Sequence, residues 1–243
     1  MKTGILLQAR CDSRRFPKKI LEKINNKTML ETVVDRLKNI NKTKLIIVTT
    51  KKKNDDKVLQ ISKKLKVKCF RGKTSDVLSR FYEAALKYKL NTIIRCNADC
   101  PLIDRKLLIK MLKKFKNNKF DYISNILDPT YPSGLHVEIF NFKSLKKAHE
   151  NALTLSDREH VTPYIYKNSK KFKIFSVKNK KNLSFHRWTV DYIKDLKFIK
   201  EIYKELDDKN NFEMKDIIKI IKNKPNLKKI NYSIEKKQNL LIK

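Results

Sequence analysis

Short apolar runs alternate with stretches of helical periodicity through the first half of the chain. The runs are continuous, as in strands that are buried on both faces of a sheet. Repeated strand–helix units favour right-handed crossovers, with helices on both faces of a parallel sheet. We therefore predict an α/β fold with a mostly parallel central sheet. The predicted strands are 5–7, 44–49, 67–70 and 92–97, and the predicted helices are 29–37, 55–65, 77–88 and 107–115.

The second half is less regular, although it contains further periodic segments. A turn-rich excursion at 127–135 has no obvious partner inside such a core, so we expect it to be buried between two copies of the chain. The chain has no internal repeat and no Gly/Ser-rich linker, which favours one domain over 1–243. Its parts are a basic loop at 8–21, an excursion region at about 126–170 and a C-terminal helical tail at about 194–243. The predicted strands are 122–125, 137–140 and 184–190, and the predicted helices are 144–153, 157–167, 194–206 and 213–221.

The net charge of +34 comes mainly from lysines that are spread over every predicted helix face. A nucleic-acid footprint would cluster on one face and favour arginine, so a nucleic-acid-binding protein is the less favoured alternative. No apolar run is long enough to span a bilayer and no signal peptide precedes the first strand, which predicts a cytoplasmic location by default. The four cysteines form no metal-ligand pattern, which argues against a zinc site.

The basic loop directly follows the first predicted strand. It contains five cations, and ligands of open α/β sheets bind just beyond the carboxyl ends of the strands. These cations need an anionic partner, and a polyphosphate fits best. The chain has only three glycines, so the GxGxxG and GxxxxGK phosphate loops are both absent. This excludes ordinary dinucleotide dehydrogenases and P-loop kinases. The cations are Arg10, Arg14, Arg15, Lys18 and Lys19.

Two aspartates, Asp99 and Asp191, each come directly after a predicted strand. Taken singly, either aspartate can be a helix N-cap. Together with the basic loop they favour a shared Mg²⁺ site, since Mg²⁺ prefers one or two carboxylates with phosphate oxygens and water. An uncompensated acidic pair repels, so we expect Asp99→Asn and Asp191→Asn to melt at or above the wild-type temperature while activity is lost.

A sugar-nucleotide-dependent glycosyltransferase is the main alternative function. A metal-binding aspartate after a strand also suits a nucleotide-diphosphate donor. The density of cations in the basic loop is more typical of a triphosphate site and argues against this alternative.

Six segments in the same order resemble the cytidylyltransferases that make CMP-activated acidic sugars. These include CMP-KDO synthetase and acylneuraminate cytidylyltransferase, and the closest resemblance is to the subgroup called spore coat polysaccharide biosynthesis protein F. The segments lie between about residues 3 and 200, and the ordered set is far more specific than any single motif. They are LLQARCDSRRFPKKIL, FRGKTSDVLSRFYEAA, NADCPLID, TYPSGLHVEIF, REHVTPYI and RWTVDYIKDL.

The resemblance implies a single-domain nucleotidyltransferase with a Rossmann-like fold, a homodimer that uses CTP and Mg²⁺. It implies transfer of CMP from CTP to an acidic sugar or similar acceptor, with release of pyrophosphate, for surface polysaccharide biosynthesis. The implied catalytic residues are Arg15, Lys19, Asp99 and Asp191, of which Asp99 and Asp191 bind the metal. The implied nucleotide-binding residues are Gln8, Ala9, Arg10, Ser13, Arg15, Lys19, Arg71, Asp76, Asn97 and Asp99. The implied acceptor-binding residues are Arg80, Tyr131, His136, Glu138, Arg158 and His160, with Glu159 in the same region.

The chain departs from the family pattern at two turns. Lys18 stands where the family usually has a glycine, and the sequence at 25–28 replaces a Gly-Gly-Lys-Pro-like turn. Asparagine tolerates a left-handed backbone better than most residues, so Asn25 and Asn26 can preserve that turn. His136 and His160 are possible proton carriers, although a single histidine is more often structural.

Overall fold

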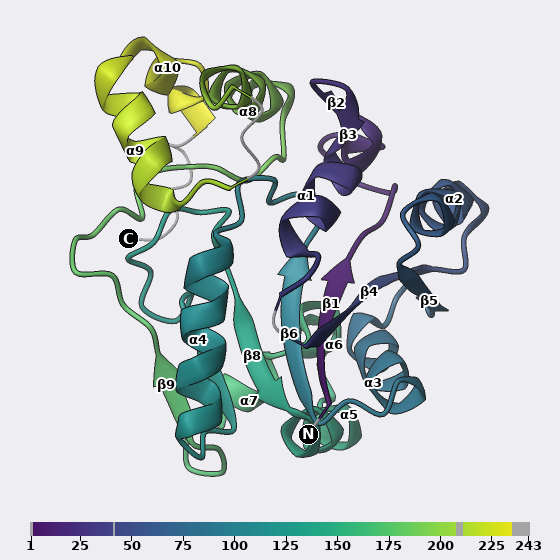
Figure 1. Ribbon diagram of the computed structural model, residues 1–243. Helices are drawn as coiled ribbons and strands as arrows, with labels where there is room; N and C mark the ends of the chain where they lie inside the picture. Colours follow the sequence, from purple (N-terminus) through teal and green to yellow (C-terminus); the bar gives the residue numbers. More distant parts are fainter. Residues whose placement is uncertain (1, 41, 208–210, 235–243) are drawn as a thin grey trace.

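The computed structural model describes residues 2–40, 42–207 and 211–234, and its centre is a seven-stranded sheet (Figure 1). The strand order is β5-β4-β1-β6-β8-β7-β9. Neighbours are parallel from β5 to β6, β8 is antiparallel to β6 and β7, and β9 is parallel to β7. The prediction of a mostly parallel sheet is confirmed. The strands are β1 (Thr3–Gln8), β4 (Thr43–Thr50), β5 (Lys68–Gly72), β6 (Thr92–Asn97), β7 (Tyr122–Ser124), β8 (Glu138–Asn141) and β9 (Ile174–Ser176).

The strand register brings the carboxyl ends of the parallel strands to one edge. Gln8, at the end of β1, pairs with Val48 of β4 and with Asn97 at the end of β6. Thr50, at the end of β4, pairs with Gly72 at the end of β5. Residues that directly follow these strands therefore meet at the same edge of the sheet.

Helices cover both faces of the sheet, as predicted. Side chains alternate along β1, so that Ile5 and Leu7 join one buried cluster and Leu6 joins the other. Helices α1 and α4 lie over the first face in Figure 1, and α8 and α9 contribute to the same cluster. Helices α3, α5 and α7 form the second. These helices are α1 (Met29–Leu37), α3 (Val77–Lys87), α4 (Arg105–Asn117), α5 (Phe142–Asn151), α7 (Pro163–Lys167), α8 (Ile193–Glu205) and α9 (Met214–Asn223).

Local capping fixes where several helices begin. Thr28 and Glu31 form a capping box at α1, where the Glu31 amide donates to Thr28 Oγ1 at 3.2 Å and the Thr28 amide donates to Glu31 Oε2 at 2.7 Å. At α3, Asp76 accepts the Ser79 amide at 2.8 Å. The remaining helices are α2 (Asp56–Lys64), α6 (Leu155–His160) and α10 (Asn226–Lys229), with 3₁₀ turns at Lys19–Leu21 and Lys53–Asp55.

Both turns that depart from the family pattern adopt the backbone that glycine would favour. Asn25 joins the short strands β2 (Lys23–Ile24) and β3 (Lys27–Thr28) with φ of 50°, as predicted for this turn. Lys18 has φ of 58° and is exposed. A left-handed conformation at Lys18 is one that glycine adopts without strain, which agrees with the glycine that the resemblance implies at this position.

Two predicted elements differ from the structure. Residues 184–190 do not form a strand, because Arg187 makes only an isolated bridge, to Ser133, and the other backbone bonds of the segment reach scattered partners such as the Asp99 carbonyl. The helix predicted at 157–167 is two helices, α6 and α7, since Val161 has φ of 74° and Pro163 starts the second. Strand β9 was not predicted.

The excursion at 127–135 also differs from expectation, since much of it is buried within its own chain. Tyr131 and Leu135 belong to the first core cluster. The Ser133 amide donates to the His186 carbonyl at 2.9 Å, and Gly134 has φ of 106°. A Cβ on Gly134 would lie 2.5 Å from the backbone carbon of Trp188, so only glycine fits this contact. The argument that this excursion lacked an internal partner is therefore wrong.

Within the described ranges, no helix is both long and apolar enough to cross a bilayer. The end of the predicted helical tail, 235–243, lies outside the described residues.

Candidate active site

A cavity of about 930 Å³ opens at the carboxyl edge of the sheet. It is lined by the basic loop, by the ends of β1, β4 and β6, and by Glu159 and Asp191 from the second half of the chain. Its volume is in the upper part of the range for small-molecule sites, roughly 300–1,000 Å³. The ligand site expected from the sequence therefore coincides with this cavity.

Backbone hydrogen bonds and one buried carboxylate hold the basic loop against the sheet. The Ala9 amide donates to the Val48 carbonyl at 3.1 Å, and the Lys18 amide closes the loop onto the Cys11 carbonyl at 2.9 Å. The Cys11 amide donates to Asp55 Oδ1 at 2.7 Å, and Asp55 is only 2% exposed. Asp55 stands at the N-cap position of α2 but makes no capping bond. It ties the loop to the end of β4 instead.

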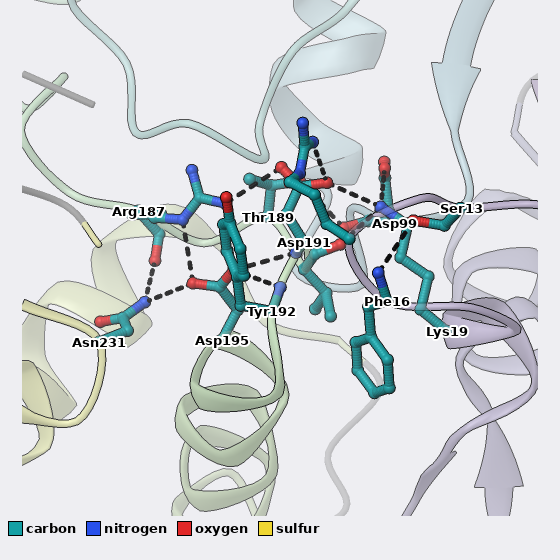
Figure 2. A network of polar contacts seen from close by, with 12 residues as sticks. Ser13, Phe16, Lys19, Asp99, Arg187, Thr189, Asp191, Tyr192, Asp195 and Asn231 are labelled. Carbon is teal, nitrogen blue, oxygen red and sulfur yellow. Dashed lines mark hydrogen bonds and ion pairs between the residues drawn. The ribbon is translucent and has the colours of Figure 1, made fainter. Parts of the chain in front are cut away.

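Lys19 lies between the two aspartates of the proposed metal site. Its Nζ donates to Asp99 Oδ2 at 2.7 Å, to Asp191 Oδ1 at 2.9 Å and to the Val190 carbonyl at 2.7 Å. Figure 2 shows these three side chains converging from the basic loop, from the end of β6 and from the segment before α8. The two carboxylates therefore lie within two hydrogen-bond lengths of each other, although the chain separates them widely.

Cations surround Asp191 more closely than Asp99. Besides Lys19, Arg15 Nη2 lies 2.7 Å from Asp191 Oδ1 and Arg187 Nη2 lies 3.0 Å from Asp191 Oδ2. Burial alone would raise the pKa of Asp191, but Lys19 and Arg15 hold this pKa well below its usual value. Burial also opposes the charge of Lys19, yet Asp99 and Asp191 raise the pKa of its ammonium. Both groups are therefore charged at neutral pH.

A second polar network positions Asp191 (Figure 2). Asp195, in the first turn of α8, is fully buried and accepts the Asp191 amide at 2.9 Å and the Tyr192 amide at 3.0 Å. Arg187 donates to both oxygens of Asp195, from Nε at 2.9 Å and from Nη2 at 3.0 Å. Asn231, from the C-terminal segment, donates to the Arg187 carbonyl at 3.0 Å.

The donor set suits a divalent cation. The carboxylates of Asp99 and Asp191 face one point at the edge of the cavity, and their side chains are 27% and 17% exposed. The Lys19 ammonium lies between them, at the position that a metal ion would occupy. Mg²⁺ needs only one or two carboxylates when phosphate oxygens and water complete its coordination. Asp99 and Asp191 are thus the residues that would hold it. Among the described residues, no group of three or more His, Cys, Asp or Glu side chains offers another site.

The structure brings the basic-loop and metal-site residues together and leaves other predicted residues away from the cavity. Glu159 is the one residue of the predicted acceptor region that reaches it. The predicted residues that line the cavity are Gln8, Arg10, Ser13, Arg15, Lys19, Asn97, Asp99, Glu159 and Asp191. Those that do not line it are Ala9, Arg71, Asp76, Arg80, Tyr131, His136, Glu138, Arg158 and His160.

Most of the second set has structural partners. Arg80 is fully buried and donates to the Lys73 carbonyl through Nε at 2.9 Å and to the Thr74 carbonyl through Nη2 at 3.0 Å, bracing the loop that borders the cavity. Glu138 is 4% exposed and accepts from Arg95 and from the Tyr122 hydroxyl. Neither side chain lines the cavity.

Most of the others in this set are also held by structural contacts or buried, whereas His160 is exposed. Asp76 caps α3 and binds Arg158 at 2.6 Å, so these two predicted ligands neutralise each other. Arg71 donates to the Thr50 carbonyl at 2.8 Å. Ala9 and Tyr131 are buried in the core. Burial lowers the pKa of His136, which is therefore neutral at pH 7.

Sequence reasoning missed several residues that shape the site. Arg95 and Lys52 line the cavity, while Arg187, Asp195 and Asn231 position Asp191 from outside it. The Arg187–Asp191 spacing of four residues and an aspartate in the first turn of α8 were available signals. Asn231 gave none, because its role depends on the fold of the C-terminal segment.

The cavity does not present an activated cysteine. Cys11 lines it, but burial and the neighbouring Asp55 raise the pKa of its thiol to about 12. Burial and Asp99 also raise the pKa of Cys100 well above its usual value. The thiolate is the nucleophilic form of cysteine, so both thiols are unreactive at neutral pH.

Comparison with known proteins identifies the family. A family model described as Cytidylyltransferase matches residues 4–233. The chain belongs to the cytidylyltransferase family. An uncharacterized protein of Methanocaldococcus jannaschii is 38% identical over 242 residues, covering 98% of this chain and 97% of that protein. The spore coat polysaccharide biosynthesis protein SpsF of Bacillus subtilis is 27% identical, covering 90% of this chain and 94% of that protein.

Solved structures agree with this assignment. A cytidylyltransferase from Leptospira borgpetersenii superimposes with a TM-score of 0.88 and 34% identity, covering 93% of this chain and 96% of the other. A CMP-2-keto-3-deoxy-manno-octonic acid synthetase solved with CTP shares the fold, with a TM-score of 0.65 and 14% identity over 85% of this chain and 100% of the other. The resemblance inferred from the sequence motifs and the nucleotidyltransferase fold are both confirmed.

Proposed function

We propose that this cytidylyltransferase transfers CMP from CTP to an acidic sugar or a similar acceptor in a Mg²⁺-dependent reaction that releases pyrophosphate. The observation that carries the proposal is the cavity in which a cationic loop faces two carboxylates that share one cation. The polysaccharide role named for SpsF and the CTP bound to the octonic acid synthetase support this choice of acceptor class and nucleotide.

The residues of the cavity suit phosphoryl chemistry that depends on positioning and charge neutralisation. An acceptor oxygen attacks the α-phosphorus of CTP, and the bond to pyrophosphate breaks in line with it. Arg10, Arg14 and Arg15 line the cavity and can meet the phosphate oxygens of the leaving group. Asp99 and Asp191 would hold Mg²⁺, which supplies further neutralisation of the phosphate charge.

Other residues that line the cavity offer groups for the acceptor. Arg95 and Asn97 come from β6, and Glu159 comes from α6. The guanidinium of Arg95 contacts Glu138 and donates to Gln8 Oε1 at 3.3 Å, so its orientation is constrained. Arg95 can form an ion pair with a carboxylate on the acceptor, and Glu159 can accept hydrogen bonds from the acceptor's hydroxyl groups.

A homodimer is also part of the proposal, with a different surface from the one first expected. Leu153, in the connection between α5 and α6, and Leu155, the first residue of α6, are 90% and 88% exposed. Both lie within the excursion region at 126–170, and side chains of this kind gain most from burial against a second copy. Light scattering at micromolar concentration should give the mass of a dimer, and Leu153→Glu with Leu155→Glu should give a monomer. A monomeric wild-type protein would refute the proposed dimer but would not contradict the proposed reaction.

The decisive experiment measures pyrophosphate release from each of the four nucleoside triphosphates against a panel of 2-keto-3-deoxy sugar acids. We expect turnover with CTP, loss of turnover with EDTA and recovery with added Mg²⁺. Asp99→Asn, purified in parallel, serves as the control for contaminating activity. Equal turnover of all four nucleotides, or turnover that survives EDTA, would contradict the proposal.

A further inference from the structure

The ammonium of Lys19 has no donor left for a ligand. Lysine has three N–H groups, and here three protein oxygens accept them, from Asp99 and Val190 at 2.7 Å each and from Asp191 at 2.9 Å. The side chain is only 9% exposed. Lys19 therefore cannot bind a phosphate oxygen until it leaves at least one of these partners.

The same ammonium occupies the position that a divalent cation would need. Mg²⁺ binds oxygen at about 2.0–2.1 Å and demands near-ideal octahedral geometry. An ammonium on the same oxygens obstructs that geometry and repels the incoming charge at short range. Arg15 adds to the obstruction, since its Nη2 lies 2.7 Å from the oxygen of Asp191 that Lys19 also contacts. Entry of a cation and the present contacts of Lys19 exclude each other.

The charges around this point already balance. Asp99 and Asp191 face Lys19 and Arg15, and Arg187 has Asp195 as its own partner. A divalent cation alone would add uncompensated positive charge to a cavity already lined by further cations. A divalent cation that enters together with a polyanionic nucleotide adds no uncompensated charge. The phosphates of the nucleotide then pair with the side-chain cations that the carboxylates release.

We propose that Lys19 is an exchange residue, which stands in for the divalent cation between Asp99 and Asp191 and moves onto a phosphate oxygen when the cation enters with the nucleotide. This inference rests on the proposed function and adds a dependence to it, namely that metal binding requires the nucleotide. The flexible four-carbon stem of lysine and its three rotatable donors allow the exchange. By linkage, the metal must strengthen nucleotide binding by the same factor, typically about 5- to 150-fold.

The first test uses Mn²⁺ without nucleotide, with the free ion measured by electron paramagnetic resonance. The wild-type protein should bind Mn²⁺ weakly, and Lys19→Met should bind it at least about tenfold more tightly. Lys18→Met is the matched control, because Lys18 lines the same cavity and its loss removes the same unit of charge. An equal gain in both variants would show a general field effect and overturn the exchange, as would no gain in Lys19→Met.

The second test needs no variant and so stands even if Lys19→Met fails to fold. Calorimetric titration of the wild-type protein with CTP, without acceptor, should give at least about tenfold tighter binding with Mn²⁺ than with EDTA. Identical CTP affinity in both conditions would overturn the exchange. The Mn²⁺ titration contains neither nucleotide nor acceptor, so a protein that fails to release pyrophosphate can still show the gain in Lys19→Met. The two proposals therefore fail separately.

Discussion

The two carboxylates that share Lys19 reach the same point by different means. Asp99 lies two residues after the end of β6, and the backbone between them is tied to the sheet, since the Ala98 amide donates to the Gln8 carbonyl at 3.0 Å. Asp191 lies in a segment without regular structure and is held by the buried side chains of Arg187 and Asp195. Backbone hydrogen bonds position a strand end, and most substitutions of its side chains leave these bonds in place. A side-chain network depends on each of its members.

This difference makes the Asp191 side of the site the more sensitive to substitution. The Asp99 carbonyl also accepts the Val190 amide at 2.9 Å, which joins the segment before α8 to the residues that follow β6. We expect damage to the network to displace Asp191 while Asp99 keeps its place.

The largest expected effect comes from Asp195→Asn. Asp195 is fully buried and is the ion-pair partner of Arg187, and breaking such a pair costs about 3–5 kcal/mol. Urea denaturation should show this loss in the free energy of unfolding, and kcat should fall more than CTP affinity because Asp191 is displaced. Asp216→Asn is the matched control, since Asp216 has the same capping position in the first turn of α9. It should cost about 1 kcal/mol and leave kcat unchanged. Similar losses in both variants would remove the special role of Asp195.

The next effect concerns the two aspartates themselves. Asp99→Asn and Asp191→Asn should each lower kcat at least about 100-fold, since each removes charge that the reaction needs. The expectation that these variants melt at or above the wild-type temperature is wrong in its premise, because Lys19 compensates the acidic pair. Thermal unfolding should show both variants below wild type, with Asp191→Asn the lower because it removes ion pairs with three cations, Lys19, Arg15 and Arg187. A variant that melts above wild type would contradict this account.

A smaller effect is expected at the mouth of the cavity. Arg15 is 55% exposed and lies 2.7 Å from Asp191. Arg15→Ala should weaken CTP binding by about ten- to hundredfold, the loss of one charge-assisted hydrogen bond of roughly 1.5–3 kcal/mol, with little change in stability. Arg105→Ala, outside the cavity, should leave the calorimetric affinity for CTP unchanged. If Arg15→Ala and the wild-type protein bind CTP with equal affinity, Arg15 does not contact the nucleotide. For Lys19→Ala we expect a loss of stability as well, since two carboxylates lose their shared partner.

The smallest effect is in the pH dependence of stability. The folded protein depresses the pKa of Asp191 below its ordinary value near 3.8. Its contribution is therefore fully present above that ordinary value and is lost as the pH falls toward the folded pKa. The melting temperatures of wild type and Asp191→Asn, measured from pH 6 down to pH 3, should converge as the pH falls. A gap that stays constant over this window would show that charge on Asp191 does not stabilise the fold.

Local and periodic features of the sequence were enough to predict most of the sheet. Strand β6 has the predicted limits of 92–97, and α1 has the predicted limits of 29–37 with a capping box at its start. These features depend on neighbours in the sequence, on apolar continuity and on capping geometry, so a local pattern carries them. The same holds for the basic loop, whose cations follow a strand end and line the cavity.

The failures share a cause. The segment 184–190 has the composition of a strand, but Trp188 is buried against Gly134 and Arg187 turns to Asp195, so contacts distant in sequence override its local preference. Arg80 and Glu138 have the chemistry of ligand-binding residues, yet burial gives them structural partners. The sequence shows which residues are charged. It does not show whether each charge is paired inside the protein or is available to a ligand in the cavity.

The sequence by itself determined the α/β class, the cationic loop after β1 and two aspartates after apolar segments. Only the tertiary structure decided that Lys19 lies between those aspartates and that Asp195, Arg187 and Asn231 hold one of them in place. The physical reason is that hydrogen bonds and ion pairs act over a few ångströms, while their partners here are 80 to 172 positions apart for Lys19 and 44 positions apart for Asn231 and Arg187. Periodicity reports which face is buried, and only the packed fold determines which charges meet.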